Sequence, residues 1–204
     1  MACGCAGCEV GCVMKALEDK ILAEGQLLPG GVLNVGRFLN QQIDTVFLKE
    51  MGAEIARLFE DSGATRILTV EASGIAVAVA AGMAMDLPVI FAKKSRTSNI
   101  NGEVYTSLVY SFTHDRENHI MVSKTYLPAG EKILIVDDFL AHGSALNGLI
   151  AIAEDADCEV VGCCAAIEKG FQMGGDNLRA RGYRVESLAI IDQMDEGGIV
   201  FRLQ

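Results

Sequence analysis

The sequence predicts an α/β fold in which a mainly parallel sheet is flanked by helices on both faces. Short apolar runs typical of buried strands alternate with segments of helical periodicity, and this alternation places crossover helices between parallel strands. Half of the 204 residues are apolar and they do not fall in low-complexity tracts, which excludes a disordered chain. We therefore expect one folded domain with no internal linker.

The formal net charge of −10 limits the partners of the chain. An acidic surface repels phosphate backbones, so we expect no nucleic-acid partner. The most apolar stretch, residues 74–85, is much shorter than the roughly 20 residues that cross a bilayer, so we expect no membrane partner. No basic segment leads into an apolar one as in a secretory signal. These features predict a cytoplasmic protein with reduced thiols.

The regular elements begin after residue 13. Leu17 and Ile21 predict a helix that starts at Met14 and ends at Gly25. An irregular apolar segment follows over residues 26–43. Asp44 is placed to cap the next helix, which stops at Gly63. The apolar stripe of that helix consists of Phe47, Met51, Ile55, Leu58 and Phe59.

The middle of the chain predicts two strands and a hairpin. RILTV (66–70) and PVIFAK (88–93) are typical of strands, with a helix of small side chains over 75–85 between them. EVYTSLVYSF and HIMVSKTYL are rich in β-branched and aromatic residues and predict a hairpin over 104–127. We interpret this hairpin either as a flexible lid that excludes water or as a rigid dimer contact.

The last third of the chain repeats the alternation. The predicted order is strand 132–138, helix 144–156, strand 160–169, helix 174–181 and closing strands 183–191 and 198–203. We expect Cys158, Cys163 and Cys164 to be small buried side chains of a strand.

The first residues are rich in cysteine. Cys3, Cys5, Cys8 and Cys12 can supply four thiolates to zinc or an iron–sulfur cluster, but they lack the paired C-x2-C hooks of regular zinc sites. A metal site and an extension over residues 1–13, ahead of a domain over 14–204, both remain open. The histidines 114, 119 and 142 are too dispersed for a metal triad. We therefore assign no metal site to the protein alone.

The most informative segment is ILIVDDFLAHGSALNGLIAI (133–152). A buried strand delivers Asp137 and Asp138 to the sheet edge where open α/β folds bind ligands. The turn that follows opens a helix whose first amide groups lack intrahelical acceptors, and such a turn can cradle a phosphate. The acids suit ribose hydroxyls or a cation instead. A strand–turn–helix in which the aspartates merely cap the helix would give the same pattern. The turn residues are Ala141, His142, Gly143, Ser144 and Ala145.

Other candidate residues follow neighbouring strands. Ala72 and Ser73 lie in the turn after residues 66–70 and can place amides on a diphosphate, although a plain βα turn looks the same. Lys93 and Lys94 end the next strand and either neutralise a leaving group or are simply solvated. Lys169, beside Phe171, either faces solvent or donates to a flat base.

The motif ILIVDDFLAHGSA resembles the phosphoribosyl-diphosphate loop of type I phosphoribosyltransferases. The usual A-T-G-G-T ending is replaced by Ala-His-Gly-Ser-Ala, a departure that resembles the xanthine phosphoribosyltransferase branch. The resemblance covers the chain from Met14 to about Leu203. The segments that carry it are MKALEDKI, VLNVGRFLNQQID, VEASGIAVAVAAG, PVIFAKK, VYSFT, VDDFLAHG, IEKGFQ and GYRVESLA.

The resemblance implies a type I phosphoribosyltransferase fold with a small hood formed mainly by residues 26–43. It implies transfer of the 5-phosphoribosyl group from phosphoribosyl diphosphate, with Mg²⁺, to N9 of xanthine, giving XMP and diphosphate in a homodimeric enzyme of purine salvage. Residues 141–145 would hold the 5′-phosphate, and Leu33, Asn40 and Lys169 would border the purine. Asp137 and Asp138 would stabilise the charge that grows at C1. Guanine or hypoxanthine transfer, and a non-catalytic ligand-sensing regulator, are the alternatives.

Overall fold

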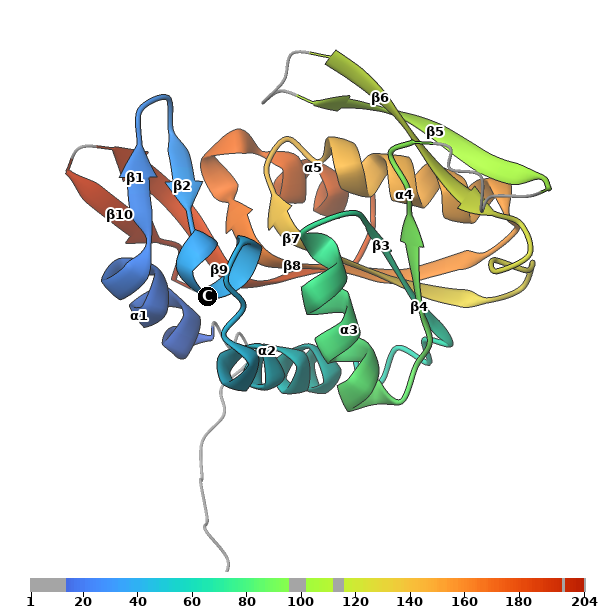
Figure 1. Cartoon of the computed structure of the whole chain (residues 1–204), viewed down its shortest axis with the longest axis horizontal. Coiled ribbons are helices and arrows are strands. Elements are labelled where there is room, and N and C mark those ends of the chain that lie inside the picture. Colours follow the sequence, from blue (N-terminus) through green and yellow to red (C-terminus); the bar gives the residue numbers. More distant parts are fainter. Residues whose placement is uncertain (1–13, 96–101, 112–115, 196, 204) are drawn as a thin grey trace, which may run out of the picture.

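A six-stranded sheet forms the centre of the computed structural model, which describes residues 14–95, 102–111, 116–195 and 197–203 (Figure 1). The strand order is β10-β9-β8-β7-β3-β4; the pairs between β9 and β4 are all parallel, and β10 is antiparallel to β9. The sheet strands are β3 (Arg66–Val70), β4 (Val89–Ala92), β7 (Lys132–Leu140), β8 (Glu159–Lys169), β9 (Val185–Asp195) and β10 (Gly198–Phe201).

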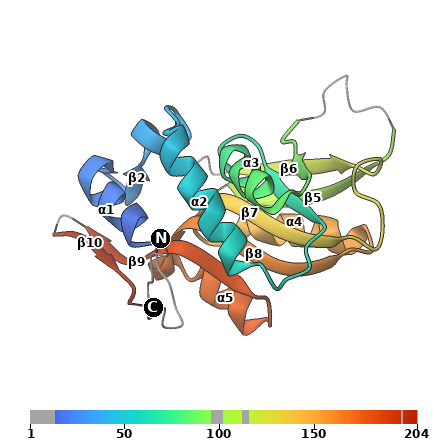
Figure 2. The ribbon, with the colours of Figure 1, turned by 90° about the horizontal axis from the view of Figure 1, so that it is seen from below.

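Helices cover both faces of this sheet, as the alternation predicted (Figures 1 and 2). One face carries α1 (Lys15–Glu24), α2 (Thr45–Leu58) and α3 (Gly74–Met85). The other carries α4 (Ser144–Asp155) and α5 (Gly174–Ala180). Each face has its own core: Met51 and Leu134 belong to the first, and Leu149 and Ile135 to the second. No helix of the described residues is both long and apolar enough to span a bilayer.

The helix ends follow the local signals in the sequence. Asp44 caps α2, since its Oδ1 accepts a hydrogen bond from the Phe47 amide at 3.1 Å. Gly25 ends α1, and its amide donates to the Ile21 carbonyl. Gly52 lets α2 approach α3 closely, because a Cβ there would lie 2.4 Å from the Ala80 carbonyl oxygen. The predicted boundaries at Gly25 and Asp44 are confirmed, but the predicted stop of the second helix at Gly63 is wrong. α2 ends at Leu58, where the Phe59 amide makes the last helical hydrogen bond, to the Ile55 carbonyl, and a turn fills the residues before Gly63.

Two hairpins stand apart from the central sheet. The predicted hairpin is confirmed as β5 (Val104–Ser111) paired with β6 (Arg116–Ser123), and its tip at 112–115 lies outside the described residues. The hairpin packs closely on α4 at Gly148, where a Cβ would lie 2.4 Å from Val109 Cγ2. β6 also bridges to Lys93 at the end of β4 through Met121.

Residues 26–43, for which the sequence predicted no helix or strand, contain regular structure. Strands β1 (Gln26–Leu28) and β2 (Val32–Asn34) pair around a turn, and a π-helical turn η1 follows over Gly36–Asn40. Cys158 also differs from the expectation. Cys163 and Cys164 are buried on β8, but Cys158 lies before that strand, half-buried, with its thiol near the Pro128 carbonyl.

Candidate active site

A cavity of about 870 Å³ opens where β3, β7 and β8 end. Its walls come from the β1–β2 turn, the turn after β3, the β5–β6 hairpin, and the turn between β7 and α4. The carboxyl ends of parallel strands share one edge of a sheet, so residues far apart in the sequence meet here. All five turn residues 141–145 line the cavity, together with Asp137, Asp138, Ala72, Ser73, Lys94 and Lys169.

The two acids lie near the end of β7, which continues through Phe139 to Leu140, two residues beyond the predicted end of this strand. Asp137 is 4% exposed, and its Oδ1 accepts a hydrogen bond from the Asp138 amide at 3.0 Å. Burial raises the pKa of Asp137 well above its usual value, the neighbouring Asp138 raises it further, and the charge of Lys94 opposes this. Burial also raises the pKa of Asp138, against hydrogen bonds from its surroundings that lower it. Asp137 is therefore a buried acid beside a partly buried one, and neither aspartate caps α4, whose N-cap is Gly143.

The turn between β7 and α4 has the shape that an anion site needs. Gly143 adopts a φ of 84°, which favours glycine, and its carbonyl accepts a hydrogen bond from Asn147 Nδ2 at 2.8 Å. The first amides of α4, beginning at Ser144, have no acceptor within the helix. The amide of Gly174, at the start of α5, donates to the Ala141 carbonyl at 3.1 Å and supports the turn from behind.

The turn after β3 approaches the acids closely. A Cβ on Gly74 would lie 2.5 Å from Asp137 Oδ1 and 2.4 Å from Thr69 Oγ1, so only glycine allows α3 to begin there. The Glu71 carboxylate accepts a hydrogen bond from the Lys94 amide at 2.7 Å and ties the ends of β3 and β4 together. Lys94 lines the cavity, whereas Lys93 does not and pairs through its backbone with Met121.

Lys169 joins the β1–β2 turn to the end of β8. Its Nζ donates to the Gly31 carbonyl at 3.1 Å and lies 5.9 Å from the centre of the Phe139 ring. Burial lowers the pKa of Lys169. This is a half-buried ammonium over an aromatic ring, not a solvated strand end.

Leu33 and Asn40, the two other residues expected at the purine, lie in different surroundings. Leu33 is 5% exposed and belongs to the core beneath the hood, so its side chain does not line the cavity; Val32, on the opposite face of the strand, does. The Asn40 side chain faces Asp138 and lowers the pKa of that carboxyl. Asn40 is thus directed at the acidic pair from η1.

Several lining residues were not identified from the sequence. Val109, Asn118 and Ile120 come from the hairpin, and Gln172 follows Lys169. The period of two in VLN could have indicated Val32, but the packing of the hairpin on α4 carries no local signal. Among the described residues, no group of three or more His, Cys, Asp or Glu side chains is arranged to hold a metal ion. The four N-terminal cysteines lie outside the described residues.

Known proteins share this architecture. The chain superimposes on adenine phosphoribosyltransferase from Thermoanaerobacter pseudethanolicus with a TM-score of 0.69 at 18% identity, covering 85% of this chain and 98% of that one. The Giardia lamblia enzyme complexed with 9-deazaadenine gives a TM-score of 0.71 at 17% identity, covering 87% and 98%. These likenesses define the fold as that of a type I phosphoribosyltransferase.

Sequence relatives make the assignment closer. Residues 42–204 match the family described as phosphoribosyl transferase domain, and the chain belongs to that family. A protein of Heliobacterium modesticaldum named xanthine phosphoribosyltransferase is 51% identical over 188 residues, covering 92% of this chain and all of the relative. A protein of the same name from Bifidobacterium animalis subsp. lactis is 51% identical over 192 residues, covering 93% and 100%. The resemblance seen in the motifs is confirmed.

Proposed function

We propose that the chain transfers the 5-phosphoribosyl group from 5-phospho-α-D-ribose 1-diphosphate to N9 of xanthine, forming XMP and diphosphate. The relatives at 51% identity carry the name of this activity. The observation that carries the proposal is structural: an acidic pair, a phosphate-type turn and a half-buried ammonium face one cavity.

The donor's charges match the walls of this cavity. The 5′-phosphate fits the turn formed by residues 141–145, where free amides and the positive end of α4 favour an anion. Asp137 and Asp138 would repel a phosphate, so they face the ribose, whose 2- and 3-hydroxyls can donate to carboxylates. Lys94 and the amides of Ala72 and Ser73 remain for the diphosphate.

Magnesium belongs with the diphosphate in this proposal. Mg²⁺ prefers oxygen ligands and is commonly held by one or two carboxylates together with substrate phosphates. The carboxylates of Asp137 and Asp138 fit that donor set, since both line the cavity. When bound, the ion would neutralise the charge of the departing diphosphate.

The acidic pair also suits the chemistry at C1. As the bond to diphosphate breaks, positive charge grows on the ribose, and a fixed carboxylate stabilises it without reorganisation. The β5–β6 hairpin lines the same cavity through Val109 and Ile120. We favour the lid interpretation of this hairpin, because its closure over the cavity would keep water from the cation-like centre.

The base would lie between the hood and the end of β8. Lys169 offers an ammonium donor to the two ring carbonyl oxygens of xanthine, and Val32 offers an apolar wall. Asn40 would contact the ring edge, or hold Asp138, from η1. Leu33 would support this wall from the core, one residue from Val32.

We further propose a cytoplasmic homodimer with a separate N-terminal extension. Val79 and Met83 lie one turn apart on α3 and are 41% and 77% exposed, which suits burial against a second copy. Residues 1–13 precede the domain over 14–204 and take no part in catalysis. Deleting residues 1–13 should leave the transfer rate unchanged, whereas a required metal at these cysteines would make the truncated protein inactive.

The direct test is nucleotide formation by the purified chain with phosphoribosyl diphosphate, Mg²⁺ and each purine in turn. XMP should form with a higher kcat/KM than GMP or IMP. Preferred turnover of guanine or hypoxanthine would make the chain an enzyme of different specificity. Binding of phosphoribosyl diphosphate without any transfer would support a ligand-sensing regulator and contradict the proposal.

A further inference from the structure

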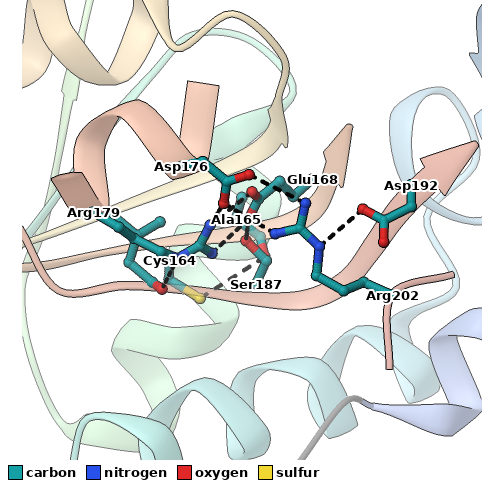
Figure 3. Close-up of polar contacts among 9 residues, drawn as sticks. Cys164, Ala165, Glu168, Asp176, Arg179, Ser187, Asp192 and Arg202 are labelled. Carbon is teal, nitrogen blue, oxygen red and sulfur yellow. Dashed lines mark hydrogen bonds and ion pairs between the residues drawn. The ribbon is translucent and has the colours of Figure 1, made fainter. Parts of the chain in front are cut away.

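A cluster of ion pairs lies directly behind the end of β8 (Figure 3). At its centre the carboxylate of Glu168, which is fully buried, accepts hydrogen bonds from Arg179 Nη1 at 2.9 Å and Nη2 at 2.8 Å. Ser187 Oγ donates to the same carboxylate at 2.6 Å. Asp176 accepts from Arg179 at 3.1 Å, so the buried charge is paired and its oxygens are satisfied.

Arg202 extends this cluster to the end of the chain. Its Nη1 and Nη2 donate to Asp176 at 3.0 and 3.2 Å, and its Nε donates to Asp192 at 2.8 Å. The guanidinium therefore holds α5 to β9 from a residue that follows β10. Arg202 keeps a raised pKa, because Asp176 and Asp192 stabilise its charged form.

The cluster is packed against Gly170 and Gly175, which lie on either side of Gln172, a residue that lines the cavity. A Cβ on Gly175 would lie 2.0 Å from Glu168 Oε1, and one on Gly170 would lie 2.7 Å from Arg202 Nη2. Gln172 lies between these glycines and Lys169 directly precedes them, and both residues line the cavity. The chain after Gln172 is held by a separate contact, in which the Gly174 amide donates to the Ala141 carbonyl.

We propose that Arg179 and Arg202, acting through Glu168 and Asp176, are positioning residues for the base-binding segment 169–173. This inference rests on the proposed function and adds to it a set of residues that never touch the substrate. The cluster fixes the segment from behind. Lys169 is then placed to donate both to the Gly31 carbonyl of the hood and to the base. Arg202, which directly follows β10, is thereby coupled to base recognition.

Arg202→Ala is the variant that tests this coupling, since it leaves the buried Glu168–Arg179 pair intact. Its KM for xanthine should rise about tenfold, with kcat and the KM for phosphoribosyl diphosphate changing less than about threefold. Arg202→Lys keeps the charge, but its single nitrogen cannot bind Asp176 and Asp192 in the forked geometry, so its KM should be intermediate.

Arg66→Ala is the matched control. Arg66 is 28% exposed and pairs with Glu131 at the opposite end of the sheet, while Arg202 is 29% exposed. Arg202→Ala should lose more thermal stability than Arg66→Ala, because Arg202 binds two carboxylates and Arg66 pairs with one, and only Arg202→Ala should raise the KM for xanthine. An equal rise in both, or no rise in Arg202→Ala beyond about twofold, would overturn the proposal.

Hydrogen–deuterium exchange of the free protein separates this inference from the proposed function. The peptide that covers residues 168–175 should exchange faster in Arg202→Ala than in wild type, and at the wild-type rate in Arg66→Ala. Faster exchange in a protein whose wild type makes no XMP would sink the proposed function and support the positioning role. Unchanged exchange would overturn the positioning role.

Discussion

Replacing Lys169 by methionine should weaken the use of xanthine about 10- to 150-fold. The Lys169 ammonium is half-buried and spends one of its donors on the Gly31 carbonyl at 3.1 Å, which leaves its others for the base. Hydrogen bonds from a charged donor contribute about 1.5–3 kcal/mol, and each 1.36 kcal/mol is a factor of ten. Methionine keeps the apolar stem beside Phe139, so the loss reports the ammonium itself.

Steady-state kinetics with both substrates varied will measure this effect. The KM for xanthine should rise by the stated factor, while the KM for phosphoribosyl diphosphate changes little. Lys132→Ala is the control, because Lys132 begins β7 at the end away from the cavity and pairs only weakly with Glu159, at 3.9 Å. Because burial lowers the pKa of Lys169, its ammonium loses its proton at a lower pH than an ordinary lysine does. As pH is raised, the wild-type KM for xanthine should therefore begin to increase at that lower pH, and Lys169→Met should not show this increase.

Two results would refute this reasoning. Equal increases in the KM values of both substrates would mean that Lys169 supports the whole cavity through the hood and not the base. An unchanged KM for xanthine would mean that the ammonium contacts only Gly31.

Four further predictions, made on three variants, concern the donor side of the cavity. In Gly143→Ala an alanine must adopt the φ of 84°, which costs about 1–2 kcal/mol. The KM for phosphoribosyl diphosphate should therefore rise about tenfold in initial-rate assays. An unchanged KM would mean that the phosphate binds elsewhere. Asp137→Asn should lower kcat about 100-fold, because it removes a carboxylate that stabilises the transition state by about 3 kcal/mol. A kcat near wild type would show that Asp137 does not stabilise the charge at C1. Because burial raises the folded-state pKa of Asp137, the wild type loses stability as pH rises above the unfolded value of about 4. The melting temperature of Asp137→Asn relative to wild type should therefore increase as pH is raised from about 4. Gly148→Ala pushes against Val109 and Ile120 and should displace the hairpin, raising hydrolysis of phosphoribosyl diphosphate measured without a base; no rise would argue that the hairpin does not exclude water.

Local patterns in the sequence predicted the elements of this fold well. The Asp44 cap and the alternation of strand and helix depend on neighbours a few residues away, and both are confirmed. The strand that carries the two acids before Gly143 is also present, although it ends at Leu140 and not at Asp138. The same locality explains why the turn at residues 141–145 could be predicted from the sequence. One strand, one turn and one helix build it, and all of them are consecutive in the chain.

Contacts between distant segments had no such signal. Whether Val32 or Leu33 faced the cavity depended on how the β1–β2 hairpin sits on α1 and the sheet, and packing buried Leu33. The bond from Lys169 to Gly31 joins residues 138 positions apart. The ion pairs of Glu168 and Arg202 likewise join β8, α5 and the chain's end. Periodicity and capping are properties of one segment, whereas these pairings arise only when the sheet order brings separate segments to a common edge.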